Sequence, residues 1–290
     1  MPLGLDDIHK NAINHLKHSS KWNKFIDLLK DCSDANPHSK KSNEHVMWEE
    51  QANINIPLMY LASIYLYHYT QEKKCTTFLF ATRDCCHWHR IFKAMYPNEK
   101  VYYFHCSRKV FEDSTSHHNS AFKSYVNSVV KNIDTTIFID IHGTGKRMFN
   151  YFDKEFHNAP YCFLLSSTFS SYSDFPKLVQ HYKAKHKLCN LIFDSSGSPI
   201  EMLNYDKIGT LVKYTSSGPE RNKLEYDYKI IKPYHKSMKY AINHIKPVDT
   251  SINHSYEELR SLIEKIYKCI KKDEPNVMKY IKHERTHKKK

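Results

Sequence analysis

The sequence predicts an α/β protein whose core is an open, mostly parallel β-sheet with helices on both faces. Between residues 56 and 200, short apolar segments of β-prone residues alternate with segments whose apolar residues have helical spacing. Strands that are apolar throughout, and not only at alternate positions, are typical of parallel sheets buried on both faces. The composition fits a folded protein, because 40% of residues are hydrophobic and 26% are charged, which is ordinary globular usage.

An N-terminal helical segment, residues 1–55, is expected before this core. Apolar residues recur at helical spacing over residues 5–31, whereas residues 32–46 are polar, contain proline and serine, and predict a loop. Residues 56–70 are apolar on nearly all sides and carry Pro57 near their start, which predicts a buried helix at the beginning of the core.

The core, residues 56–200, is expected to contain strands connected by helices. The strands are expected at residues 76–81, 101–106, 135–140, 161–166 and 189–193. The helices are expected at residues 86–96, 120–132 and 147–156. Residues 112–119, EDSTSHHN, are polar and predict a loop, and we expect the segment 110–119 to be mobile and to close over a bound ligand.

Two further segments follow the core. Residues 201–254 are mixed in composition and are expected to form a hood over the acceptor of a bound ligand. Residues 255–290 combine a helix over 255–272 with a basic tail. Ser255 together with Glu258 predicts a capping box at the start of that helix.

The charge and the cysteine content indicate the class of partner and the cell compartment. The balance of 44 Lys and Arg against 31 Asp and Glu gives a formal net charge of +13, which favours phosphate-bearing partners. The eight cysteines form no CxxC pair, so we expect reduced thiols in an intracellular, cytoplasmic protein. The N-terminus has no signal-peptide pattern, and no apolar run is long enough to span a membrane.

The third expected strand ends in a motif suited to binding a sugar phosphate. Asp140 closes the strand, and the following residues Ile-His-Gly-Thr-Gly-Lys-Arg hold two of the six glycines of the chain. Backbone N–H groups of residues 142–146 can form a nest for phosphate oxygens, because Gly143 and Gly145 let a ligand approach the backbone. The alternative explanation of this motif is a tight strand-to-helix turn capped by Asp140, with no role in binding a ligand. A Walker A loop is excluded, because Arg147 stands where that motif requires Ser or Thr.

The spacing of Asp140, Thr144 and Gly145 resembles the signature of type I phosphoribosyltransferases, an apolar strand and two acids followed by a loop ending in Thr-Gly. The other matching pieces are Thr82-Arg83-Asp84 after the first strand and Ser107-Arg108-Lys109 after the second. The resemblance covers residues 56–200. The order of these pieces is also similar to a poorly characterised group, often labelled haloacid-dehalogenase-like, found in bacterial polysaccharide gene clusters and large DNA viruses.

This resemblance implies a ligand and a role for each matching residue. The ligand would be phosphoribosyl pyrophosphate or a related sugar phosphate, with Mg²⁺ held mainly by the pyrophosphate, and the phosphoribosyl group would pass to an acceptor that the sequence does not identify. The implied residues are Asp140, Arg108 and Lys109 for catalysis, His142, Gly143, Thr144, Gly145 and Lys146 for the 5′-phosphate, and Thr82, Arg83 and Asp84 for pyrophosphate. The chain departs from the signature at Ile139, which replaces the first acid, and at Cys85, which replaces a glycine.

Two other interpretations remain open. The segment from Asp140 through His142 to Thr144 is similar to the start of a haloacid-dehalogenase phosphatase motif, in which Asp140 would be the nucleophile and Asp194 a metal ligand. A basic surface and the basic C-terminal tail would instead suit a non-catalytic module that binds nucleic acid.

Several of these residues also have simple structural explanations. Arg83-Asp84 can be an ion pair at a strand end, and Arg108-Lys109 can be a solvated pair. The histidines that occur close together are His87, His89, His117 and His118. They have no cysteine or acid at ligand spacing, so no metal ion bound by side chains is expected. Cys85-Cys86 is expected to be buried as small apolar residues.

Overall fold

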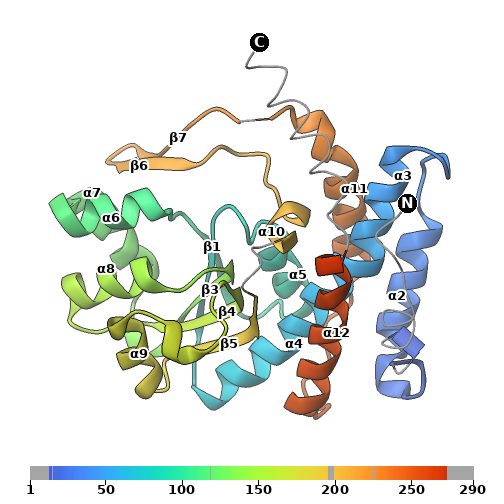
Figure 1. Ribbon diagram of the computed structural model, residues 1–290, viewed down its shortest axis with the longest axis horizontal. Helices are drawn as coiled ribbons and strands as arrows, with labels where there is room; N and C mark the ends of the chain where they lie inside the picture. The colour runs from blue at the N-terminus through green and yellow to red at the C-terminus, as the bar shows by residue number, and fades with distance from the viewer. Residues whose placement is uncertain (1–12, 15, 118, 195–198, 225, 273–290) are drawn as a thin grey trace.

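A five-stranded parallel sheet forms the centre of the protein in the computed structural model, with the strand order β2-β1-β3-β4-β5 (Figure 1). The residues that the structure describes are 13–14, 16–117, 119–194, 199–224 and 226–272. The strands are β1 (Thr77–Ala81), β2 (Lys100–Phe104), β3 (Thr136–His142), β4 (Tyr161–Ser167) and β5 (Leu188–Phe193). All the expected strands therefore lie in one parallel sheet, and the predicted fold class is confirmed.

Helices cover both faces of this sheet. On one face lie α4 (Ile56–Glu72) and α5 (Trp88–Met95), with α12 (Tyr256–Lys272) packed against α4 (Figure 1). On the opposite face lie α6 (Arg108–His117), α7 (Ser120–Val129), α8 (Lys146–Phe156) and α9 (Lys177–Ala184). The direction in which the chain adds strands reverses between β1 and β3. Ligand sites of such sheets lie at the carboxyl ends of the strands beside this reversal.

The burial of the strands follows their place in the sheet. β1 is buried along its whole length and β3 over its first four residues, which explains why both are continuous apolar runs. β2 lies at the edge of the sheet, and its residues alternate between exposed and partly buried as far as Phe104. Because the strand ends at Phe104, Cys106 at the end of the expected strand lies beyond it.

The segment that was expected to be a mobile polar loop is helix α6, so that prediction was wrong. The helix begins after Ser107, whose Oγ accepts a hydrogen bond from the N–H of Val110 at 3.1 Å. Val110, Phe111 and Ser114 are buried, and the helix contacts α7, α8 and β6. The polar composition of this segment conceals a narrow buried face with helical spacing, which is enough to fix the helix in place.

The N-terminal helices pack together with the C-terminal part of the chain. α2 (Asn23–Asp34) and α3 (Asn43–Glu50) contact α11 (Tyr228–His244), beside the sheet (Figure 1). The expected loop at 32–46 is shorter, because α2 continues to Asp34 and α3 begins at Asn43. A π-helical turn, Gln51–Asn55, joins α3 to α4. Buried residues of all these helices belong to the same apolar core as the sheet.

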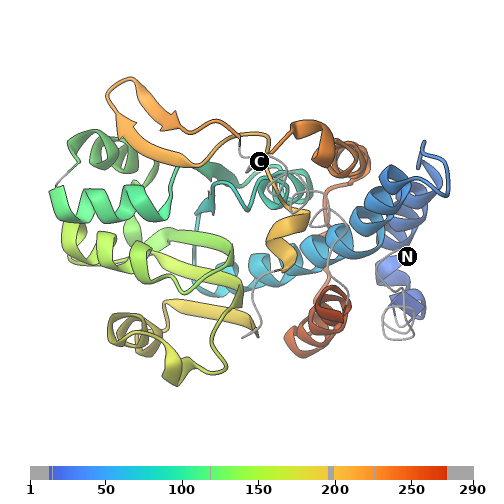
Figure 2. The ribbon, with the colours of Figure 1, turned by 45° about the horizontal axis from the view of Figure 1, so that its top comes forward.

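Residues 201–254 include most of α10 (Pro199–Leu203), a hairpin of β6 (Leu211–Thr215) and β7 (Gly218–Arg221), and α11. The hairpin lies over α6 and α7, apart from the main sheet (Figure 2). At the start of α12, the N–H of Glu258 donates to Oγ of Ser255 at 3.3 Å, as expected for a helix cap. The basic tail after Lys272 lies outside the described residues. Within the described part of the chain, no helix is long and apolar enough to cross a membrane.

Candidate functional site

A cleft of about 570 Å³ opens where β1, β2 and β3 end. Its lining includes Thr82, Arg83, Asp84, Arg108, Lys109, Asp140, His142, Gly143, Thr144, Gly145 and Lys146, which are the site residues expected from the sequence. The cleft also receives Glu201, Tyr205 and Thr210, which sequence reasoning missed. The structure therefore places Arg83, Arg108 and Asp140 in one cleft, as the parallel strand order requires.

The turn between β3 and α8 favours glycine at two positions. Gly145 has φ +68°, in the left-handed region, and a Cβ added there would lie 3.0 Å from the ring of Phe149 and 3.3 Å from the sulfur of Cys162. A Cβ added at Gly143 would lie 3.3 Å from Oδ2 of Asp140. Both positions therefore favour glycine, Gly145 because of its φ as well as its contacts.

The backbone amides of this turn are only partly available to a ligand. The N–H of Gly143 donates to the carbonyl of Ser166 at 3.2 Å, and the N–H of Lys146 donates to Oγ1 of Thr144 at 3.2 Å. Among the described residues, the amides of Thr144 and Gly145 have no hydrogen-bond partner. The phosphate nest predicted over residues 142–146 is therefore narrower in the structure, with its open donors at Thr144 and Gly145.

Asp140 lies near the carboxyl end of β3 and lines the cleft. Burial and then the neighbouring carboxylate of Asp84 raise the pKa of Asp140 to about 8, while the N–H of Ile141 and the guanidinium of Arg108 oppose this rise. Asp140 therefore carries a proton at neutral pH unless a bound cation or a hydrogen-bond donor stabilises its charged form.

Glu201 and Asp84 complete a group of acids around the cleft. Burial, followed by the charges of Asp84 and Asp140, raises the pKa of Glu201 to about 8. Burial also raises the pKa of Asp84, against the lowering effects of Arg83 and Arg108. No motif surrounds Glu201 in the sequence, since the packing of α10 against β3 brings it to Asp140. The local sequence held no signal that would have identified it.

Cationic side chains surround these acids. Arg108 and Lys109 are exposed in the first turn of α6, and Lys146 and Arg147 are exposed in the first turn of α8. Nε of Arg147 forms an ion pair with Glu112 of α6, which links the two helix starts. Because both helix N-termini line the cleft, their backbone dipoles add to the positive charge of these side chains. The arrangement is suited to binding an anion.

The loop after β1 is held in place by hydrogen bonds. Oγ1 of Thr82 donates to the carbonyl of Cys106 at 3.0 Å and accepts from the N–H of Cys106 at 3.2 Å. The hydroxyl of Tyr103 lies 2.9 Å from the carbonyl of Arg83 and 2.5 Å from a carboxylate oxygen of Asp206. The Thr82–Arg83 peptide bond is cis. These contacts position the backbone that carries Arg83 into the cleft.

His142 is neutral and has a defined tautomer. The Ser166 hydroxyl donates to the carbonyl of Ile141 at 3.0 Å, so its oxygen is left to accept from Nδ1 of His142 at 2.9 Å. Burial lowers the pKa of His142 to about 4. Nε2 of His142 therefore carries a lone pair at neutral pH and can accept a hydrogen bond in the cleft.

The remaining candidate residues lie outside the cleft. Asp194 is fully buried after β5 and accepts a hydrogen bond from the Tyr267 hydroxyl at 2.8 Å. Cys85 and Cys86 are buried, as expected, and burial raises the pKa of both thiols. The ring of His89 stacks on Tyr103 with centroids 4.4 Å apart. The side chains of His117 and His118 lie outside the described part of the chain.

Comparisons with protein-family models, with curated proteins and with solved structures found no match. The features of the structure that bear on function are the half-buried acids of the cleft, the cations around them and the open backbone amides.

Proposed function

We propose that the cleft binds phosphoribosyl pyrophosphate or a related sugar phosphate, and that the protein transfers the phosphoribosyl group to an acceptor. The observation that carries this proposal is the convergence of cationic side chains, open backbone amides and half-buried carboxylates in one cleft. A sugar diphosphate presents phosphate groups on both sides of a ring that carries hydroxyls. Such a ligand needs hydrogen-bond donors and cations for the phosphates and acceptors for the hydroxyls, and the cleft contains both.

Each part of the ligand has a matching part of the cleft. The 5′-phosphate would lie against the open amides of Thr144 and Gly145, at the start of α8. The pyrophosphate would lie against Arg83 and Arg108, whose guanidinium groups suit bidentate contacts with phosphate. Asp140 would accept hydrogen bonds from the ribose hydroxyls between these two sites.

Glu201 would supply the second carboxylate that the family signature provides at an earlier position. Ile139 occupies that position, and its side chain is fully buried. Glu201 lines the cleft, and its charge and that of Asp140 act on each other. We therefore assign the role of the missing acid to Glu201, which is remote in sequence.

The donor set of the cleft also fits Mg²⁺. This ion prefers oxygen ligands, retains several waters and binds through one or two carboxylates together with substrate phosphates. Asp84, Asp140 and Glu201 offer carboxylate oxygens, and burial raises the pKa of all three, so a bound divalent cation would favour their charged forms. When bound, the ion would neutralise charge on the departing pyrophosphate.

Transfer would break the bond between C1 of the ribose and a pyrophosphate oxygen and form a bond from C1 to a nitrogen or oxygen of the acceptor. The carboxylates of Asp140 and Glu201 would stabilise the positive charge that develops on the ribose, and Arg83 and Arg108 would stabilise the leaving pyrophosphate. His142 lines the cleft and could accept a hydrogen bond from the acceptor, but its pKa of about 4 makes it a weak base, so the proton that the acceptor loses would pass to solvent or to the departing pyrophosphate.

A phosphatase with Asp140 as nucleophile is the second candidate. One observation favours it, because β3 is the central strand of the sheet. One observation weakens it. Asp194, its expected metal ligand, is held by Tyr267 and does not line the cleft.

Calorimetric titration with phosphoribosyl pyrophosphate, in the presence and absence of Mg²⁺, tests the proposal. We expect binding that Mg²⁺ strengthens, and Asp140→Asn should weaken it about tenfold or more, since it removes a charged hydrogen-bond acceptor. Asp27→Asn, an exposed acid on α2, is the control and should bind as the wild type does.

Two outcomes would contradict the proposal. Binding of an RNA oligonucleotide but not of the sugar phosphate, with affinity that falls steeply with salt, would favour the nucleic-acid module. Hydrolysis of a phosphate monoester that Asp140→Asn abolishes would favour the phosphatase.

A further inference from the structure

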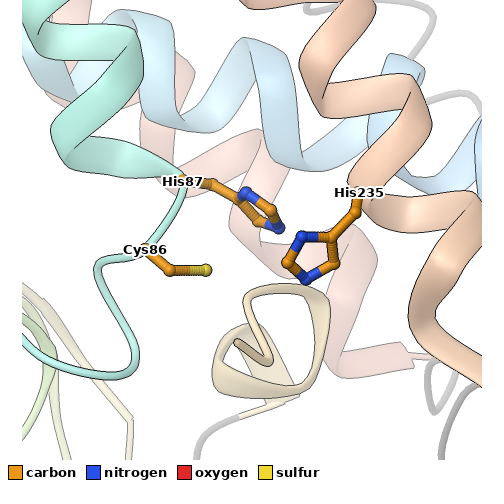
Figure 3. A group of neighbouring side chains, drawn as sticks. All are labelled: Cys86, His87 and His235. Atoms are coloured by element: carbon orange, nitrogen blue, oxygen red, sulfur yellow. The ribbon is translucent and has the colours of Figure 1, made fainter. Parts of the chain in front are cut away.

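Three side chains with metal-ligating atoms lie close together where the loop that follows β1 meets α11. Cys86 and His87 lie between β1 and α5, and His235 lies on α11 (Figure 3). The ligating atoms of the three residues all lie within 4.8 Å of one another. The rings of His87 and His235 have centroids 4.6 Å apart. Residues far apart in the sequence are thus gathered into one small cluster.

His87 is buried without any hydrogen bond. Its exposed fraction is 1%, and both of its ring nitrogens lack a partner. Burial of a polar group without a partner is costly, so nearly all such groups in folded proteins are satisfied. Figure 3 shows that the ring of His87 points toward His235, with the sulfur of Cys86 on the same side. The unsatisfied ring is thus directed into the cluster.

His235 is oriented so that one nitrogen faces this cluster. Its Nε2 lies 2.8 Å from the carbonyl of Tyr205, which can only accept, so Nε2 carries the proton. Nδ1 is then left with a lone pair, and it is the nitrogen directed toward His87 (Figure 3). A carbonyl that fixes the tautomer of a histidine in this way is typical of metal sites.

We infer that Cys86, His87 and His235 bind a divalent cation of the zinc class. One thiolate sulfur and two imidazole nitrogens suit Zn²⁺ or Co²⁺, whereas Mg²⁺ prefers oxygen ligands. Three protein ligands leave a fourth, tetrahedral position for water. This site is therefore distinct from the carboxylates of the cleft and does not depend on the proposed transferase activity.

Binding changes the bonding of Cys86 in a balanced way. In the structure its thiol donates to the carbonyl of Asn204 at 3.2 Å. On binding, the sulfur would lose its proton to solvent and donate an electron pair to the cation, with no change of oxidation state. Arg90 places a positive charge near the Cys86 sulfur, and the buried Asp206 places a negative charge near it.

The cation would connect the cleft to the C-terminal helices. Cys86 follows Arg83 and Asp84 in the same loop, while His235 bonds to Tyr205, which lines the cleft. A bound ion would therefore fasten α11 and the segment after α10 to the loop after β1. Its role would be structural, because it would fix the relative positions of two walls of the cleft.

Titration of metal-free protein with Co²⁺, followed by absorption spectroscopy, tests this inference. We expect equimolar binding, with the visible bands of tetrahedral cobalt and a thiolate-to-cobalt charge-transfer band in the near ultraviolet, and Zn²⁺ should displace both. His235→Gln should weaken binding by more than the 10–100-fold that loss of an outer-shell partner costs. Cys86→Ser should remove the charge-transfer band.

A matched control uses His254, another buried histidine with a ring nitrogen that lacks a partner. It has Trp22 and not a cysteine beside it, so His254→Gln should keep the wild-type spectrum. Circular dichroism of each variant without metal establishes that it is folded. Absence of the charge-transfer band in the wild-type protein would overturn the inference, as would a band of equal intensity in Cys86→Ser.

Discussion

Gly145 is the residue whose replacement best separates phosphate binding from folding. Its φ of +68° is one that a valine adopts only with strain, and the added Cβ would approach the ring of Phe149. We expect Gly145→Val to lower the affinity for phosphoribosyl pyrophosphate at least about tenfold. Its stability loss should be about 1–3 kcal/mol. Calorimetric titration and denaturant unfolding measure these two effects.

Gly218 provides the control for this substitution. It also has a positive φ, +112°, but it begins β7 outside the cleft, and no atom lies within 4 Å of an added Cβ. Gly218→Val should therefore lose stability through backbone strain while keeping the wild-type affinity. If Gly145→Val bound phosphoribosyl pyrophosphate as tightly as Gly218→Val does, the proposed phosphate nest would be wrong.

The site residues that could be predicted from the sequence are those that follow a strand directly. Asp140 and Arg83 belong to local motifs, and a parallel sheet necessarily gathers the ends of its strands. Glu201 and His235 have no such local context. They reach Asp140 and His87 only because α10 and α11 pack against the core, and this packing depends on contacts between segments remote in sequence.

Helix α6 is the element for which sequence and structure differ most. The five strands are recognisable because each is a continuous apolar run, whereas α6 buries only a narrow face within a polar sequence. The start of α6 depends on the hydrogen bond that the N–H of Val110 donates to Oγ of Ser107. A serine within a polar segment does not by itself predict such a helix cap. Local polarity predicts a loop here, whereas the contacts of this segment with α8 and β6 stabilise a helix.

The helical state of α6 predicts slow amide hydrogen exchange in the protein without ligand. Amides of residues 112–116 should be protected, because they lie in a helix whose Phe111 and Ser114 side chains are buried. Hydrogen exchange followed by mass spectrometry measures this directly. The polar connection between α2 and α3, residues 36–41, lies outside regular helices and should exchange rapidly as the internal control.

Hydrogen exchange with and without ligand distinguishes a preformed helix α6 from a mobile lid. If α6 were a mobile lid, its amides would exchange as fast as those of residues 36–41 and become protected only with phosphoribosyl pyrophosphate. With a preformed helix, the ligand should change exchange mainly at the first turn, where Arg108 and Lys109 line the cleft. Fast exchange throughout α6 in the free protein would contradict the structure.

At the scale of the whole molecule, segments remote in sequence share one apolar core. α2 and α3 from the start of the chain pack on α11, and α12 packs on α4. α2 and α12 are amphipathic, but an amphipathic face does not specify its partner. Individual contacts such as the hydrogen bond from Tyr234 of α11 to Glu50 of α3 select the pairing, and they join residues remote in sequence.

The buried acids of the cleft should also make the stability of the whole protein depend on pH. Asp140 and Glu201 have pKa values of about 8 in the folded protein, well above their ordinary values near 4. Between these limits the folded state retains protons that the unfolded state has released. The free energy of unfolding from these groups therefore falls as pH rises, and their contribution is lost as pH passes through about 8.

Other groups limit the pH window in which this effect can be measured. Burial lowers the pKa of His89 and of His142 to about 4, so these rings add stability as pH rises, but only up to their ordinary pKa near 6.5. Buried thiols, such as that of Cys85, have raised pKa values and act only above their ordinary value near 8.5. Other buried histidines, among them His87 and His235, also have lowered pKa values, so the effect of the cleft acids is isolated as the difference between the wild type and a variant that lacks them.

Thermal unfolding of the free protein at pH 6.5, 7.2 and 8 is the measurement, compared between the wild type and Asp140→Asn combined with Glu201→Gln, which lacks both titrating groups. The midpoint of the wild type relative to that of the double variant should fall across this series by roughly a few degrees. Asp27→Asn, remote from the cleft, should keep the wild-type dependence. Phosphoribosyl pyrophosphate with Mg²⁺ should stabilise the wild type more at pH 8 than at pH 6.5, because the bound cation favours the ionised acids and their protons are already lost at the higher pH. A difference between the wild type and the double variant that stayed constant across the series would mean that these two acids are ionised in the free protein.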